Sequence, residues 1–150
     1  MVTKADIQNF LEPRRFAIAG VSRNPKKFGR VVYEDLKKAG YTLYPVNPNM
    51  QEIEGAKCYA GIGELPGDVK HLFIATAKKD TDAVLQEAIR KGITHVWVQQ
   101  MSETPATMQI AAESNIRLIS KKCIFMFADP VNGVHKFHRC MMGLFGRLPK

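Results

Sequence analysis

Cysteine is scarce in this sequence and is not arranged for a structural role. The three cysteines, Cys58, Cys123 and Cys140, are odd in number and widely spaced, with no C-x-x-C motif and no histidine at zinc spacing. This argues against a disulfide framework and a metal site, so we expect reduced thiols. Cys123 follows Lys121 and Lys122, which leaves two interpretations open: a thiol activated by neighbouring positive charge, or, more often for a lone cysteine at a strand end, a small packed residue.

Long apolar runs are also absent. No segment approaches the roughly 20 apolar residues that cross a bilayer, so we expect no transmembrane segment. The first ten residues, MVTKADIQNF, are polar and interrupted, unlike the apolar centre of a signal peptide. We therefore expect a cytoplasmic protein. A chain of 150 residues with 45% hydrophobic content has the size of one domain with one core.

Acidic residues are fewer than basic ones. The chain has 22 Lys and Arg against 14 Asp and Glu, a formal net charge of +8, which favours an anionic partner. The basic residues are scattered, and no nucleic-acid recognition motif or aromatic pair in a basic strand accompanies them. Nucleic acid is therefore not favoured. Charge alone does not identify the anion, and it is the strand, cationic loop and helix from Phe16 onward that favour a small-molecule nucleotide ligand.

The glycine fingerprint of dinucleotide-binding proteins is missing, although its surrounding elements are present. Residues 16–21 form an unbroken apolar run typical of a buried strand, a cationic loop follows, and apolar residues recur at helical spacing from Phe28. This order places free backbone N–H groups and the positive end of a helix dipole beyond the strand, where phosphate binds well. Ser22 stands where the second glycine of G-x-G-x-x-G would fall.

Strand and helix patterns then alternate along the chain. Further strands are predicted at residues 41–46, 69–75, 95–99 and 116–120, and further helices at 79–91 and 104–114. A short helix capped by Thr3 precedes the first strand. The alternation predicts an α/β fold: a single doubly wound, Rossmann-like domain over residues 1–128, with a five-stranded parallel sheet in the order 3-2-1-4-5.

In such a sheet, ligands bind beyond the carboxyl ends of the strands. We call the residues that follow the carboxyl end of a strand its exit. The exit of the second strand, VNPNMQ, lacks the acid that holds the ribose of NAD and an arginine for the 2′-phosphate of NADP, which counts against both cofactors. Asn47 is open to two interpretations, a ligand contact or a turn stabiliser, and Gln99 and Gln100 to ligand contacts or hydrogen bonds within the loops. His71 lies away from the exits and is expected to be structural. No acid–base pair, Ser-His-Asp order or metal cluster falls at these exits, which indicates binding more than catalysis.

Four segments carry a family resemblance: AGVSRNPKKFG, GYTLYPVNP, WVQQ and KKCIF. They resemble the small stand-alone CoA-binding domain proteins, which are similar to the N-terminal domain of the succinyl-CoA synthetase alpha subunit. The resemblance spans residues 16–127 and implies a Rossmann-like sheet with CoA or an acyl-CoA across the strand ends. It implies ligand contacts from Gly20, Val21, Ser22, Arg23, Asn24, Lys26, Lys27, Phe28, Gly29, Asn47, Pro48, Thr76, Ala77, Gln99, Gln100 and Cys123.

The resemblance also assigns parts of the ligand to parts of this set. The loop from Gly20 through Lys27 would contact the nucleotide and its phosphates, and Asn47 with Pro48 would flank the adenosine. Gln99 and Gln100 would line the pantetheine arm. Where several relatives have Phe-Arg and Asp-Arg-Cys, this chain has Ala75-Thr76 and Lys121-Lys122-Cys123.

The synthetase's phosphohistidine belongs to a second domain, and neither His135 nor His138 matches it. We therefore expect a CoA- or acyl-CoA-binding or regulatory module without ligase activity, and assign no catalytic residue. Whether it is an enzyme stays open, with two alternatives: an NAD(P)-dependent oxidoreductase domain, and thiol exchange between Cys123 and CoA.

Residues 129–150 carry an apolar stripe among basic residues, roughly at helical spacing. We expect this amphipathic tail to pack on its own domain or on a second copy in a homodimer. An anionic membrane surface is the alternative.

Overall fold

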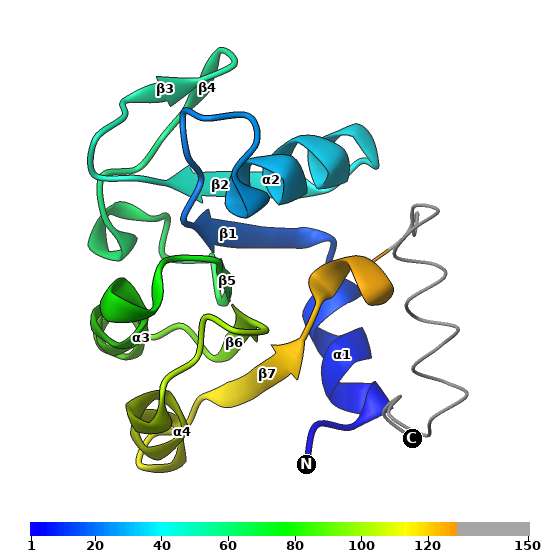
Figure 1. Ribbon diagram of the computed structural model, residues 1–150, viewed down its shortest axis with the longest axis vertical. Coiled ribbons are helices and arrows are strands. Elements are labelled where there is room, and N and C mark those ends of the chain that lie inside the picture. Colours follow the sequence, from blue (N-terminus) through cyan, green and yellow to red (C-terminus); the bar gives the residue numbers. More distant parts are fainter. Residues whose placement is uncertain (129–150) are drawn as a thin grey trace.

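Five parallel strands form the centre of the computed structural model, which describes residues 1–128 (Figure 1). They are β1 (Arg15–Ala19), β2 (Thr42–Val46), β5 (His71–Ile74), β6 (His95–Gln99) and β7 (Arg117–Lys122). The sheet order is β2-β1-β5-β6-β7, and every neighbouring pair is parallel. The predicted doubly wound fold with a five-stranded parallel sheet is confirmed.

The predicted 3-2-1-4-5 pattern is present when one rudimentary strand is counted, with β7 then as a sixth strand after it. An isolated parallel bridge joins Val46 to Tyr59 on the outer side of β2, with Tyr59 N donating to Pro45 O at 2.9 Å. This segment takes position 3, so β5 becomes the fourth strand, beside β1. Our placement of the strand at residues 69–75 beyond the second strand was therefore wrong. Leu72, Phe73 and Ile74 are fully buried, which requires a central position with both faces covered.

A second feature was absent from the sequence-based prediction: the hairpin β3 (Glu52–Ile53) and β4 (Ala56–Lys57). Glu54 and Gly55 connect its strands, both with positive φ, at 49° and 79°. Two positive φ values in a two-residue connection suit the right-handed twist of a hairpin. Strands this short give no apolar alternation to detect. The helical turn predicted in the same loop is present as η1 (Ile62–Glu64).

In the described part of the chain, four helices cover the two faces of the sheet. They are α1 (Lys4–Leu11), α2 (Phe28–Lys38), α3 (Lys78–Lys91) and α4 (Pro105–Ala112). One apolar cluster joins α1 and α2 to the sheet through Phe10, Phe16, Ile18, Val32, Leu36, Phe73 and Trp97. The other joins α3 and α4 to the opposite face through Ala17, Leu72, Ile74, Leu85, Val96, Val98 and Ile110. Residues adjacent along a strand thus face different layers, as a sheet buried on both faces requires.

Several helix ends follow the sequence signals. Thr3 and Asp6 form a capping box at α1, Gly92 ends α3 with φ of 84°, and Pro105 opens α4. His71 is structural, as predicted, because its Nδ1 lies 3.1 Å from Phe10 O. Within residues 1–128 no helix has the length and apolar character needed to cross a membrane. The predicted amphipathic tail, residues 129–150, lies outside the described residues.

Candidate functional site

The first strand exit is built around Gly20, which follows β1 and lies against Ala75 at the end of β5. Ala75 N donates to Ala19 O at 2.9 Å, so the two strand ends remain joined beyond β5. Gly20 has φ of 99°, and a Cβ added there would lie 2.5 Å from Ala75 O. Only glycine combines this positive φ with room for the neighbouring backbone, because a residue with a Cβ would be strained and would overlap Ala75 O. Gly20 therefore sets the turn that carries the chain away from β1.

Gly29 lets α2 begin directly against that turn. A Cβ at Gly29 would overlap Gly20 O and lie 2.9 Å from Gly20 C. Within the described residues, no side chain caps the N-terminus of α2, and its first turn contains no acidic residue. The first backbone N–H groups of a helix have no partner inside it. The N-terminus of α2 is thus an unclaimed set of donors at the positive end of a helix dipole.

Side chains within residues 22–27 hold the loop in shape. Ser22 Oγ accepts a hydrogen bond from Asn24 N at 3.0 Å, and Asn24 Oδ1 accepts one from Lys26 N at 2.9 Å. Both are local turns of the kind that serine and asparagine stabilise. Lys26 and Lys27 are exposed and lie directly before the first residue of α2, Phe28.

Asn47 ties the second strand exit to the first. Its Nδ2 donates to Val21 O at 2.7 Å and its Oδ1 accepts from Asn49 N at 2.8 Å. Arg23 Nη2 also donates across the gap, to Asn49 O at 2.7 Å. Of the two interpretations for Asn47, the structure shows the turn-stabilising one. Arg23, predicted as a phosphate contact, is here bound to a backbone carbonyl.

Arg30 is a site residue that the sequence reasoning missed. Its Nη1 donates to Ser22 O and to Arg23 O, both at 3.2 Å, which fixes the carbonyls of the cationic loop. Its Nε lies 2.6 Å from Glu34 Oε1, and its Nη2 lies 3.4 Å from Glu54 Oε1. The side chain is only 14% exposed. The i,i+4 spacing of Arg30 and Glu34 was the available signal, but it indicates a helix-surface pair, not a loop clamp.

The third exit leads into a second uncapped helix. Thr76 Oγ1 lies 3.0 Å from Thr81 Oγ1, and Ala77 begins α3 with no side-chain cap from the described residues. By contrast, Thr3 and Thr104 cap α1 and α4 with complete capping boxes. Since unsatisfied helix N-termini attract anions, α2 is the better equipped of the two for a negatively charged ligand, because Asp80 already places a carboxylate in the first turn of α3.

The last two exits are closed by internal hydrogen bonds. Gln99 is 6% exposed and its Oε1 accepts from Ile124 N at 3.2 Å, which holds the 3-10 turn η2 (Ile124–Met126). Gln100 N donates to Lys122 O at 3.2 Å. For Gln99 the structure therefore shows the interpretation as a hydrogen bond between loops.

Cys123 begins η2 and is 3% exposed. The Phe28 and Phe125 rings meet edge to face, with centroids 5.5 Å apart, and join η2 to the start of α2. This packing matches the interpretation of Cys123 as a small buried residue, and it brings the first and last strand exits into one apolar cluster.

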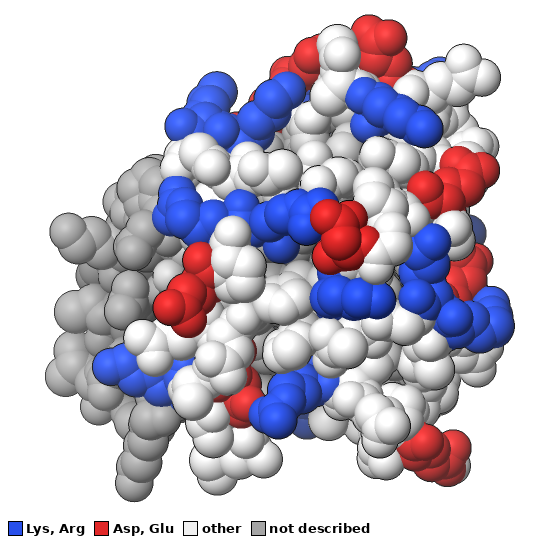
Figure 2. Space-filling model, turned by 180° about the vertical axis from the view of Figure 1, so that it is seen from behind, with Lys and Arg blue, Asp and Glu red and all other residues white. Residues whose placement is uncertain are grey.

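The assembled site offers donors and positive charge. Within residues 1–128 no group of three or more His, Cys, Asp or Glu residues is placed to hold a metal ion. His71 and His95 stack at 4.4 Å at the beginning of β5 and β6, the end of the sheet away from the exits. On the face seen in Figure 2, Lys and Arg are dispersed among Asp and Glu, as the scattered sequence positions predicted.

A doubly wound sheet with a glycine turn, a cationic loop and uncapped helix N-termini at its switch point defines a Rossmann-like α/β module. The family model described as CoA binding domain matches residues 14–129, so the chain belongs to this family of CoA binding domains.

Characterised relatives are much longer than this chain. It is 32% identical over 126 residues to the alpha subunit of acetate–CoA ligase [ADP-forming] II from Pyrococcus furiosus, a match that covers 77% of this chain and 28% of that subunit. It is 26% identical over 123 residues to the uncharacterised protein YneT from Bacillus subtilis, covering 81% of this chain and 91% of YneT. The chain thus corresponds to about a quarter of the ligase subunit and to nearly all of the small relative.

Solved structures show the same fold. A conserved hypothetical protein from Pyrococcus furiosus superposes with a TM-score of 0.72 at 34% identity, covering 74% of this chain and 96% of that one. A hypothetical protein from Pyrococcus horikoshii superposes with a TM-score of 0.74 at 28% identity, covering 82% and 87%. Two proteins of which this chain covers 96% and 87% therefore share the architecture described above.

Proposed function

We propose that this protein binds CoA or an acyl-CoA across the carboxyl ends of its strands and acts as a binding or regulatory module without ligase activity of its own. The observation that carries the proposal is the α2 N-terminus: a set of unclaimed backbone donors beside Lys26 and Lys27. Membership of the CoA binding domain family supports CoA as the anion. The matched region of the acetate–CoA ligase subunit supports the same ligand.

The phosphates are proposed to lie over Gly20, Val21 and Ser22 and the first turn of α2. Gly20 and Gly29 bring the turn and the helix into backbone contact, which leaves no Cβ to keep a phosphate from the N–H groups. Lys26 and Lys27 supply mobile charge, whereas Arg23 and Asn24 hold the loop through their own hydrogen bonds. Charge-assisted contacts of this kind contribute about 1.5 to 3 kcal/mol each, less where solvated.

The rest of the ligand is proposed to follow the exits outward from this anchor. Pro48, exposed beside the hydrogen-bonded Asn47 turn, would flank the adenosine. Thr76 and Ala77 would face the ligand at the second uncapped helix. Gln100 and the edge of Phe28 would border the pantetheine arm, with Cys123 beneath them.

The same geometry argues against chemistry at Cys123. A thiolate nucleophile needs access to its substrate and a group that activates it. Cys123 is 3% exposed, and the histidines of the described part lie at the other end of the sheet. Passive binding is therefore favoured over thiol exchange.

A thermal-shift titration tests the proposal with CoA, acetyl-CoA, dephospho-CoA, pantetheine, NAD and NADPH. A ligand at 100 times its dissociation constant stabilises the folded state by about 2.7 kcal/mol. We expect stabilisation by CoA and acetyl-CoA, and a weaker response to pantetheine because it lacks the nucleotide phosphates. Stabilisation by NAD or NADPH alone would refute the proposal and favour the oxidoreductase alternative.

A pair of variants tests the position of the phosphates. Lys26→Ala/Lys27→Ala should weaken CoA more than pantetheine. The matched control, Lys38→Ala/Arg90→Ala, removes the same charge from exposed positions near the opposite ends of α2 and α3. Equal losses for CoA and pantetheine, or equal losses in both double variants, would place the phosphates elsewhere.

A further inference from the structure

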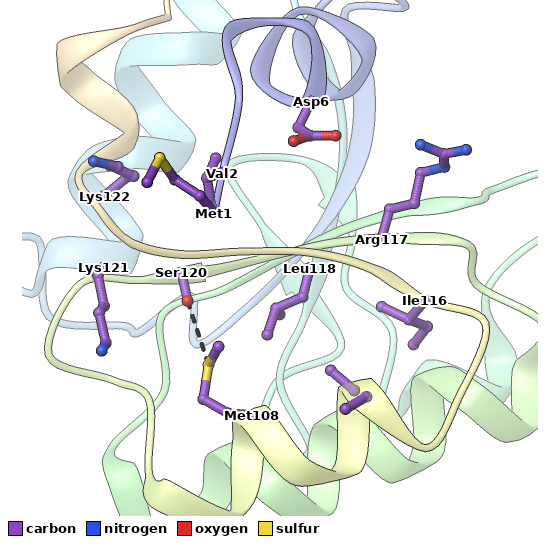
Figure 3. Close-up of a pocket in the computed structure, with 12 residues that line it drawn as sticks. Met1, Val2, Asp6, Met108, Ile116, Arg117, Leu118, Ser120, Lys121 and Lys122 are labelled. Carbon is purple, nitrogen blue, oxygen red and sulfur yellow. Dashed lines mark hydrogen bonds between the residues drawn. The ribbon is translucent and has the colours of Figure 1, made fainter. Parts of the chain in front are cut away.

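A groove runs along the outer edge of β7, away from the strand exits that form the proposed CoA site. It has a volume of about 550 Å³ and is lined by Met1, Val2, Asp6, Met108, Ala111, Ala112, Ile116, Arg117, Leu118, Ser120, Lys121 and Lys122. Figure 3 shows Val2 and Asp6 on one side of β7 and Met108 on the other. The groove therefore lies between the helix layers of the two sheet faces, in the place that a further strand would take.

The floor of the groove is a strand edge with backbone groups directed outward. Within residues 1–128, β7 is the last strand of its sheet and pairs with β6 alone. Arg117 N donates to Thr94 O at 2.8 Å, so Arg117 faces β6. Successive residues of a regular strand direct their N–H and C=O groups alternately, so Leu118 and then Ser120 direct theirs into the groove. The regular edge ends there, because the pairing with β6 shifts register after Ile119 and Lys121 has φ of 58°. An unpaired edge of this kind is a template for another extended chain.

The walls suit the side chains of such a chain. Met108, Ala111 and Ala112 of α4 form one apolar wall, and Ser120 Oγ donates to Met108 Sδ at 3.5 Å. Val2 and Met1 form the opposite wall. Because side chains of an extended strand alternate between two sides, a bound segment would direct small apolar residues to α4 and its other residues past α1.

Charge determines which extended chain fits. Arg117 and Lys121 are exposed at the two ends of the edge, and no salt bridge found among the described residues uses either. Asp6 is the acid on the lining, and its Oδ2 accepts from Thr3 N at 2.8 Å and from Thr3 Oγ1 at 2.7 Å. Its single negative charge is outnumbered by the positive charges of Arg117, Lys121 and Lys122. The groove is therefore a positively charged slot for a negatively charged strand.

Two other candidates for the groove, a second copy of this chain and residues 129–150, would bring positive charge to a positively charged edge. Two copies paired antiparallel about Ile119 would set Arg117 opposite the partner's Lys121, and like charges directly opposite destabilise a strand pair. The remaining segment of this chain, residues 129–150, has Lys136, Arg139, Arg147 and Lys150 against one acid, Asp129.

We propose that the β7 edge binds an extended acidic segment of another protein, which adds a strand to the sheet by backbone pairing with Leu118 and Ser120. β-Strand addition of this type takes its affinity from main-chain hydrogen bonds and its specificity from the side-chain pockets. Arg117 and Lys121 select for acidic residues through complementary charge.

The probe is a fluorescein-labelled peptide of alternating Glu and Val, compared by fluorescence anisotropy with its Lys-Val counterpart. We expect saturable binding of the acidic peptide only. Arg117→Glu/Lys121→Glu should weaken it by about tenfold or more, and the control Lys38→Glu/Arg90→Glu by less than about twofold, because its charges lie away from the groove. Loss of equal size in both double variants would overturn the proposal, since it would reflect net charge alone.

Amide hydrogen exchange of the unaltered protein gives a second readout that does not depend on a variant folding. The acidic peptide should slow exchange at Leu118 and Ser120. Unchanged exchange at these amides with the peptide bound, absence of saturable binding, or occupation of the groove by decanoate but not by the peptide would each refute strand addition.

Discussion

Replacing Gly29 by alanine sets two physical effects against each other. Alanine is favoured over glycine inside a helix by about 1 kcal/mol, so helix propensity alone predicts a more stable protein. The structure predicts the opposite, because the added Cβ would overlap Gly20 O and lie 2.9 Å from Gly20 C. Both partners are backbone, so no side chain can rotate away and α2 must move off the glycine turn.

Overpacking of this kind costs about 1 to 3 kcal/mol, and a backbone-on-backbone overlap belongs at the upper end of that range. After subtraction of the propensity gain of about 1 kcal/mol, the net loss in the free energy of unfolding should be about 2 kcal/mol. The CoA affinity should fall as well, since the helix N-terminus that we propose as the phosphate site would shift away from the loop.

Urea unfolding measures the stability change directly. Trp97, the one tryptophan of the chain, is fully buried and reports unfolding by its fluorescence. Gly63→Ala is the matched control, because nothing lies within 4 Å of an added Cβ there. We expect the control to change stability by less than about 0.5 kcal/mol. A Gly29→Ala protein as stable as the unaltered one, with equal CoA affinity, would refute the close approach of α2 to the β1 turn.

Three further predictions follow from single contacts. Burial lowers the pKa of the His71 imidazole, so the unfolded chain binds a proton more readily than the folded protein. The contribution of His71 to the free energy of unfolding should be constant above about pH 6.5 and fall below it. A urea midpoint at about pH 5.5 equal to that at neutral pH would contradict the burial of His71. Asn47→Ala removes the bond to Val21 O and should cost about 1 to 2 kcal/mol in urea unfolding, with weaker CoA binding by calorimetry. In the Cys58→Ser/Cys140→Ser protein, Cys123 is the one remaining thiol, and it is 3% exposed. It should therefore react with a thiol reagent only at the rate at which the protein opens locally, and immediate labelling would contradict its burial.

Much of the fold was predictable because its signals are local. Thr3 before an apolar-periodic stretch, Gly92 after another and Pro105 at a helix start define ends through capping and backbone geometry alone. Alternation of strands and helices then limits the architecture to a parallel sheet covered on both faces. The cationic loop and its helix were predicted for the same reason, since phosphate-binding geometry follows from a strand, a turn and a helix in succession.

The functions of individual side chains at the site were not predictable in this way. Arg30 looks like half of an i,i+4 pair in the sequence, yet it also holds the carbonyls of Ser22 and Arg23. Gln99 follows a strand as a ligand-binding residue would, yet its amide oxygen accepts from Ile124 N. In both cases the decisive partner belongs to a different loop, so its position depends on how the chain folds back.

The sequence by itself determined the segments that form the helices and the strands of the main sheet, where the positive charge lies and that this sheet is parallel, because each depends on residues close together in the chain. Tertiary structure alone decided that β5 lies beside β1, that α2 begins against the Gly20 turn, and that β7 leaves a charged edge between two helix layers. These features are contacts between segments far apart in sequence, and such contacts are selected by competition for buried area across the whole sheet.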